Sequence, residues 1–431
     1  MISNRHWSDD DCGTRFKLFP QPPFLEEYGE PEIIEVSSPA GSVGPGPSDH
    51  RMFVIDPVDK SHSYGMHKDS RGESYLYLPP WDGGRFAPVL PDEMGHFDYL
   101  EPGTREFECA HLFGTVRWVL DIWEGYFGRE IEWHFTQAFP RLELILLNNW
   151  DNAQSGFGFI EVGYFDSDAG THLPYALNFD ILAHEVGHSI IYAEVGVPVP
   201  ETEAAEYFGF HESAADLVAL ISALHFDSVV DNLLQNTRGN LYTLNKLSRI
   251  AELSEYEQVR LAANTRRLSE FANGWVDEHH LAQPLTGAVF DVFIDIFHSL
   301  LHQRGLIHTH LAAMADTLPV QDADEWEIQR LFDAEYENRH DDFKLCLLEA
   351  RDIIGYWLAF ACGHLSPHHF DYNDVMQTML HADEEITAGR YRFSIEQNFD
   401  WRQIGSVSAG PRLPSAQAGG HVNTSRTVIP D

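Results

Sequence analysis

The chain has 431 residues, of which 67 are acidic and 28 are Lys or Arg, and its formal net charge is −39. This length predicts one large domain or two lobes, and an apolar content of 43% is ample for a core. The strong negative charge argues against nucleic acids and anionic membranes as partners. No run of 18 apolar residues is present, so no membrane span is expected.

The beginning of the chain has the composition of a linker. Residues 1–50 are rich in Pro, Gly, Ser and charged residues, most clearly over Ser37–Ser48, so a flexible N-terminal segment is expected there. The first residues include no apolar run of the kind that a secretory signal needs. We therefore expect a cytoplasmic location, or export by a route that does not use such a signal.

The apolar pattern further along the chain predicts both strands and helices. Short apolar segments predict strands at Met52–Ile55, Ser74–Leu78, Ile131–Phe135, Leu142–Leu147 and Phe157–Phe165. Longer segments predict helices, most clearly at Phe107–Phe127, Pro284–Leu301, Phe343–Cys362 and Tyr372–Asp383. Residues 406–431 are rich in Gly, Pro and Ser, and a disordered tail is expected there.

The pentapeptide His184-Glu185-Val186-Gly187-His188 is the strongest chemical signal in the chain. Residues four apart share a helix face, so both imidazoles can reach one metal ion. Zinc binds nitrogen ligands and keeps an open position for water in hydrolytic sites, and Glu185 beside that position can take a proton from the water. The alternative is an amphipathic helix with two histidines on its polar face.

A second predicted helix, Gly209–Ile221, offers a third ligand. Glu212 and Asp216 are four residues apart and share a face of that helix. Glu212 can complete a site of two histidines and one carboxylate, and Asp216 can accept a hydrogen bond from the non-ligating nitrogen of a ligand histidine. The alternative is a solvated acidic helix face.

These two motifs resemble those of the thermolysin-like gluzincin metallopeptidases. In that family HExxH is followed, roughly 20 or more residues later, by a Glu in an N-E-x-x-S-D type motif. Here the motifs are HEVGH and HESAAD, with His211 where the family commonly has Asn and Ala215 where it has Ser. The resemblance runs from about residue 105 to about residue 405, and it implies that His184, His188 and Glu212 bind Zn²⁺.

The same resemblance implies further roles. Glu185 would be the general base and Asp216 the hydrogen-bond partner of a ligand histidine. Asn152 and Ala153 would bind an extended peptide at an edge strand, for which an ordinary strand with a tight turn is the alternative. His280, or failing it His279, would stabilise the oxyanion before a helix that begins near Pro284, with Asp277 orienting it. Ca²⁺ is a second expected cofactor, at Asp180.

The implied fold is α+β and two-lobed, like that of thermolysin. An N-terminal α/β lobe with a β-sheet, the edge strand and the HEVGH helix is expected over residues 51–195. A mainly helical C-terminal lobe is expected over residues 196–405.

The sequence therefore predicts a zinc metalloendopeptidase that acts on a peptide or protein substrate. Two alternatives stay open. An aminopeptidase, or another zinc hydrolase on the same scaffold, would need an acidic anchor for a free amine. A catalytically inactive protein-binding module would be marked by the loss of Glu185 or of a ligand, and all of these residues are present.

Overall fold

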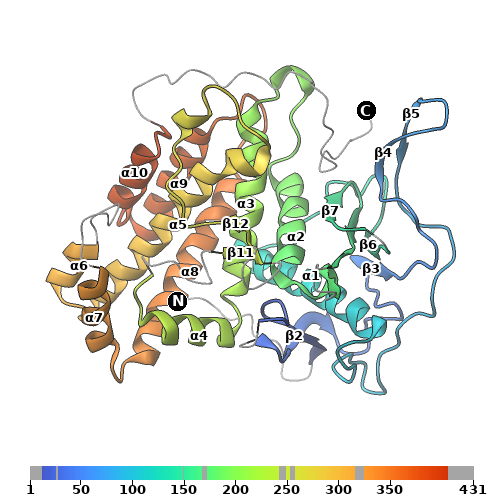
Figure 1. The fold of residues 1–431 in the computed structure, drawn as a ribbon, viewed down its shortest axis with the longest axis horizontal. Helices are drawn as coiled ribbons and strands as arrows, with labels where there is room; N and C mark the ends of the chain where they lie inside the picture. The colour runs from blue at the N-terminus through green and yellow to red at the C-terminus, as the bar shows by residue number, and fades with distance from the viewer. Residues whose placement is uncertain are drawn as a thin grey trace.

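The computed structural model describes residues 12–25, 28–148, 150–166, 172–241, 249–252, 258–315 and 325–405. The first part of the chain contains most of the strands, and the rest is mainly helical (Figure 1). The predicted α+β class is confirmed, with a β-sheet in the N-terminal region and helices in the C-terminal region. The predicted tail, 406–431, lies outside the described residues.

Short strands alternate with loops and one long helix up to residue 174. The strands are β1 (Gly13–Leu18), β2 (Glu32–Pro39), β3 (Met52–Ile55), β4 (Gly65–Lys68), β5 (Ser74–Tyr77), β6 (Leu142–Leu146), β7 (Ala153–Gly156), β8 (Phe159–Val162), β9 (Tyr164–Asp166) and β10 (His172–Pro174). The long helix α1 (Arg105–Phe127) lies between β5 and β6.

Helices dominate after residue 178. They are α2 (Phe179–Glu194), α3 (Ala205–Ala223), α4 (Asp227–Thr237), α5 (Glu278–Gln303), α6 (Thr309–Ala315), α7 (Glu325–Tyr336), α8 (His340–Cys362), α9 (Tyr372–Thr387) and α10 (Arg392–Trp401). A two-stranded antiparallel sheet of β11 (Arg249–Glu252) and β12 (Gln258–Leu261) lies between α4 and α5 in the chain.

The main sheet has four strands in the order β3-β6-β8-β7. Strands β3, β6 and β8 are parallel, and β7 is antiparallel to β8 at the edge. All residues of β6 are buried, because both faces of the sheet are covered. Leu142, Leu144 and Leu146 belong to the main core with residues of α1, whereas Ile145 belongs to a small second core on the opposite face.

A buried ionic cluster fastens the segment between β3 and α1 to this second face. Lys60 Nζ lies 2.6 Å from Glu161 Oε1, with both side chains fully buried. The Tyr64 hydroxyl donates to Glu143 at 2.6 Å, and its backbone N–H donates to Glu161. Burial raises the pKa of Glu143 and of Glu161 and lowers the pKa of Lys60, so these groups depend on one another for their charges.

The N-terminal segment differs from the flexible chain that its composition predicted. Strands β1 and β2 form an antiparallel hairpin that packs on α1, and Phe16 and Leu18 are fully buried. Gly114 of α1 makes the close approach possible, because a Cβ there would lie 2.8 Å from the Phe16 ring. The alternation of Thr14, Phe16 and Leu18 is thus a strand pattern that the neighbouring Gly and Pro residues obscured.

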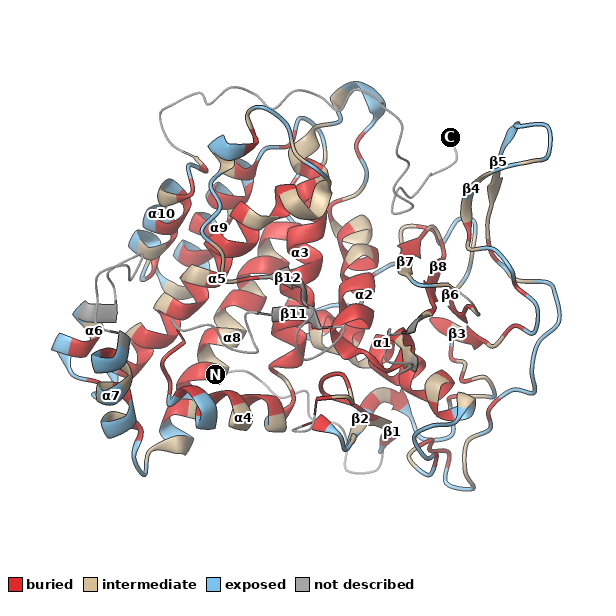
Figure 2. Cartoon of the chain, in the orientation of Figure 1, coloured by how far each residue is buried: buried red, intermediate tan, exposed pale blue. Residues whose placement is uncertain are grey.

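The helical region is built around α5, which packs against α3, α8 and α10. Buried residues are concentrated along α2, α3 and α5, whereas β4, β5 and α7 carry many exposed ones (Figure 2). Among the described helices, α5 alone is long and apolar enough to cross a membrane, and α3 with α4 pass only as a pair bent by 91°. The apolar window of α5 is 83% buried inside the protein, so its apolar residues face the core.

One predicted strand and one predicted helix start were wrong, and the predicted strand Phe157–Phe165 is divided into β8 and β9. Ile131–Phe135 is not a strand, although the alternate residues Ile131, Trp133 and Phe135 are buried, because the segment turns. Helix α5 begins at Glu278 rather than near Pro284. Asp277 caps the helix by accepting a hydrogen bond from the backbone N–H of His280, and this cap outweighs the start signal of the proline.

Candidate metal centre

Helix α2 presents both histidines of HEVGH on one face. The side chain of Asn178 caps the helix by accepting a hydrogen bond from the Ile181 N–H at 3.2 Å. The apolar side chains of α2 are buried in the main core, which fixes the rotation of the helix. His184 is almost fully buried, and His188 keeps a small exposed area. The face of α2 that is not packed into the apolar core therefore carries the two imidazoles.

Helix α3 packs closely along α2. A Cβ on Gly187 would lie 2.8 Å from the Cα of Ala215, so the small residues at these two positions set the helix separation. Ala215 is one of the departures from the family pattern, and it lies where α2 and α3 touch. This close approach brings Glu212 of α3 to the histidines of α2.

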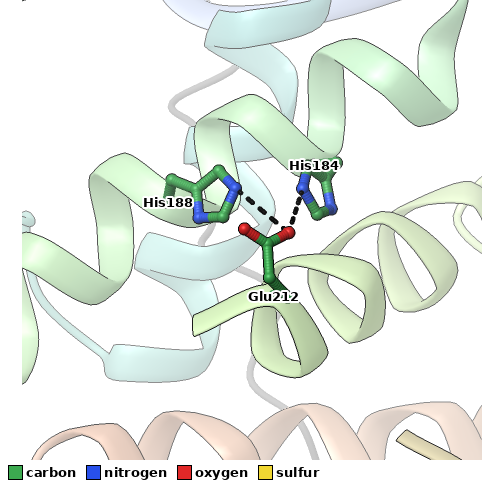
Figure 3. Close-up of side chains that lie close together, drawn as sticks. All are labelled: His184, His188 and Glu212. Carbon is green, nitrogen blue, oxygen red and sulfur yellow. Dashed lines mark ion pairs between the residues drawn. The ribbon is translucent and has the colours of Figure 1, made fainter. Parts of the chain in front are cut away.

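His184, His188 and Glu212 converge on one point (Figure 3). One ligand atom from each residue lies within 4.8 Å of the other two. His184 Nε2 and His188 Nε2 lie 3.3 Å and 3.7 Å from Glu212 Oε2. Burial acts to raise the pKa of Glu212, but the nearby His188 and His279 lower it by more. The pKa of Glu212 is therefore well below its usual value. Two imidazole nitrogens and one carboxylate oxygen form a donor set that suits Zn²⁺.

Two side chains from α3 hold the other ring nitrogens of the histidines. Asp216 Oδ1 lies 2.9 Å from His184 Nδ1. His211 Nδ1 lies 2.8 Å from His188 Nδ1, a contact that the sequence did not predict. Burial lowers the pKa of His211 to about 3, so its neutral ring can accept a hydrogen bond from His188. Both contacts leave the Nε2 atoms directed toward Glu212.

His279, and not His280, reaches the cluster. His279 Nδ1 lies 2.7 Å from Glu212 Oε2. The His280 ring instead packs against Phe271, with the ring centroids 4.8 Å apart. The preference for His280 assumed that the helix begins near Pro284. Because α5 begins at Glu278, consecutive histidines point in different directions around it, and His279 faces α3.

The remaining predicted site residues lie on the elements around the cluster. Glu185 is buried on α2, next to His184. Asn152 precedes β7 and Ala153 begins it, at the edge of the main sheet. Strand β7 lies beside α2, since Ser155 Oγ is 2.8 Å from Ser189 Oγ. Within the described residues no strand pairs with the outer side of β7.

Asp180, the expected calcium position, contacts the N-terminal segment. This side chain is buried in the first turn of α2 and accepts a hydrogen bond from the Gln21 amide at 3.0 Å. Among the described residues, the only group of three or more His, Cys, Asp or Glu side chains placed to hold a metal is His184, His188 and Glu212. The first turn of α2 is thus tied to the N-terminal segment.

The thermolysin-like peptidases also use an Arg and a Tyr near the metal, and by sequence the candidates here are Tyr207 and one of Arg249, Arg266 and Arg267. Tyr207, the nearest tyrosine by sequence, donates its hydroxyl to the backbone oxygen of Gly196 at 2.5 Å. Arg266 pairs with Glu270, and Arg267 stacks over Trp401. None of these contacts directs a side chain toward His184, His188 or Glu212.

Comparisons with known proteins give a distant likeness. No family model and no curated protein match the chain. The chain is similar to the solved structure of the precursor of protealysin, a metalloproteinase from Serratia proteamaculans. That match has a TM-score of 0.41 and 12% sequence identity, and it covers 86% of this chain and 90% of that chain. At such values the likeness carries no argument about activity, and the function rests on the residues of the site.

Proposed function

We propose that this protein is a zinc-dependent metallopeptidase that hydrolyses internal peptide bonds. The observation that supports this best is the convergence of His184, His188 and Glu212, whose ligand atoms lie within 4.8 Å of one another. A hydrolytic zinc site commonly has three protein ligands of this kind and an open position. Zn²⁺ held there would polarise the substrate carbonyl and lower the pKa of a water molecule.

The protein's own residues have distinct tasks in this proposal. Glu185, adjacent to His184 on α2, takes a proton from the attacking water and delivers it to the departing amine. Asp216 and His211 keep the two histidines in the tautomer that exposes Nε2. His279 donates a hydrogen bond to the substrate oxygen as negative charge develops on it, and its contact with Glu212 supports this role.

Substrate binding uses the open edge of the sheet. An extended peptide can add to β7 as a further strand, with backbone hydrogen bonds that tolerate varied sequences. Asn152 and Ala153 lie at the start of that edge, and β7 runs beside the helix that carries HEVGH. A peptide on this edge would pass close to the metal ligands.

The decisive experiment measures metal content and peptide cleavage together. We expect one zinc per chain, cleavage of an unstructured protein substrate, loss of cleavage with a chelator and its recovery on addition of Zn²⁺. Cleavage at an unchanged rate by metal-free protein would contradict the proposal. A protein that binds zinc through this cluster and cleaves no peptide would instead favour the binding-module alternative.

A further inference from the structure

The part of the chain that builds the candidate metal centre contains no basic side chain other than histidine. Residues 142–237, which include β6 to β8, α2 and α3, have no Lys and no Arg. The same range holds 15 acidic residues: Glu143, Asp151, Glu161, Asp166, Asp168, Asp180, Glu185, Glu194, Glu201, Glu203, Glu206, Glu212, Asp216, Asp227 and Asp231. Residues 268–303, which include α5, likewise have no Lys or Arg and hold five acidic residues.

Cations from elsewhere reach this range mainly away from the metal ligands. Lys60 pairs with Glu161 behind the sheet, Arg129 pairs with Glu194 at the end of α2, and Lys344 pairs with Asp227 and Asp231 of α4. His184 and His279 lie against Glu212, and His184 also lies against Asp216.

Acidic side chains also flank the places where a peptide would enter and leave. Asp151 is exposed and immediately precedes Asn152 and β7. Glu278 is partly exposed in the first turn of α5 and immediately precedes His279, which contacts Glu212. A substrate that lies along β7 and past the start of α5 would therefore pass the two segments that carry these carboxylates.

We propose that the substrates of this site are cationic peptides, with Lys or Arg on either side of the bond that is cleaved. This inference rests on the proposed function and names its substrate class. A negative potential concentrates positively charged partners near the site and raises their association rate by about 10- to 1000-fold, and it disfavours acidic partners to a similar degree. Backbone pairing to β7 alone would not discriminate between them.

The first test compares two peptides with the same central sequence, one flanked by Lys and the other by Glu. At an ionic strength of about 0.01 M the Debye length is about 30 Å, and at about 1 M it is about 3 Å. We expect kcat/KM to be at least ~10-fold higher for the Lys-flanked peptide at low salt, and the ratio to fall toward one at high salt. Equal values at low salt, or a preference for the Glu-flanked peptide, would overturn the proposal.

The second test locates the source of the preference. Asp151→Asn combined with Glu278→Gln neutralises the two flanking carboxylates, and we expect the low-salt ratio to fall several-fold. The matched control combines Glu337→Gln with Asp342→Asn, which remove two exposed charges near α7, on the far side of the helical region (Figure 1). An equal fall in the control would show that net charge alone acts, and the local proposal would be wrong.

A binding measurement separates this proposal from the proposed function. Fluorescently labelled peptides are titrated into the Glu185→Gln variant, which is expected to bind peptides without cleaving them. Tighter binding of the Lys-flanked peptide, lost with the Asp151 and Glu278 substitutions, supports the charge preference even if no peptide is cleaved by the unsubstituted protein. If peptides are cleaved but bind without regard to charge, the proposed function stands and this inference fails.

Discussion

His188 and His211 face each other through their Nδ1 atoms at 2.8 Å. Only one proton can lie between these two nitrogens, so one ring donates and the other accepts. If His188 is to offer Nε2 to a metal, its Nδ1 must carry the proton, and His211 must accept. His211 thereby selects the tautomer of a candidate ligand from the position next to Glu212 in the chain.

Removing this acceptor should weaken metal binding. We expect His211→Leu to raise the zinc dissociation constant by about 10- to 100-fold, as loss of such partners commonly does. His211→Asn keeps a side-chain oxygen that can accept from His188 and should retain most of the affinity. Competition with a chromogenic chelator measures both. Equal losses in the two variants would mean that His211 acts by packing alone.

The three candidate ligands should be needed for metal binding. His184→Ala and Glu212→Ala should lose zinc or bind it much more weakly, because two remaining donors hold the ion poorly. Elemental analysis after gel filtration measures the content. His381→Ala, at an exposed histidine on α9, is the control and should keep full occupancy. Full zinc content in both ligand variants would rule out this site.

Glu185 should be needed for hydrolysis and not for metal binding. Glu185→Gln nearly keeps the size of the side chain but cannot accept a proton at neutral pH. We expect normal zinc content and an unchanged unfolding temperature. The remaining rate of cleavage should be close to the detection limit. A wild-type cleavage rate in this variant would exclude Glu185 as the base.

The two neighbouring histidines of α5 should behave differently. His279→Ala should lower kcat by about 100-fold or more with little change in KM, because the stabilising hydrogen bond would form mainly in the transition state. His280→Ala should keep a near-normal kcat, since its ring packs on Phe271. Steady-state kinetics on one peptide compares them directly. A loss confined to His280→Ala would restore the assignment that the sequence favoured.

The buried pair of Lys60 and Glu161 should matter for stability. Lys60→Met leaves a buried carboxylate without its cation and should lower the free energy of unfolding by about 3–5 kcal/mol. Arg71→Met breaks only exposed pairs on the same segment and should cost about 0–1 kcal/mol. Urea unfolding followed by fluorescence gives both values. Adding Glu161→Gln to Lys60→Met should recover part of the loss, and a further decrease would argue against this explanation.

The cluster of candidate metal ligands could be predicted from the sequence because a helix fixes the relation between residues four apart. Predicting that His184 lies beside His188, and Glu212 beside Asp216, required only that geometry. Predicting that the two pairs meet required only that the two helices be in contact. Choosing between His279 and His280 required knowing where α5 begins, and the cap at Asp277 sets that position. The role of His211 depended on a contact between two helices, which spacing along one helix does not reveal.

The strands of the main sheet were predicted better than the segments around them. Met52–Ile55 is a continuous apolar run, and Leu142–Leu146 is apolar except for Glu143, because both faces of the sheet are covered. The hairpin of β1 and β2 was missed, since its burial depends on a distant glycine on α1. Ile131–Phe135 has the alternation of a strand, yet it pairs with no other strand of the described chain.

The hydrogen bond between Gln21 and Asp180 joins two residues separated by 159 positions in the sequence. Phe19 beside it donates its backbone N–H to His111 of α1. The first turn of the helix that carries HEVGH is therefore completed by residues synthesised long before it. Folding has to close that long loop before α2 is fully anchored. A chain shortened to begin at α1 would carry the candidate metal ligands on a helix that lacks these contacts to its first turn.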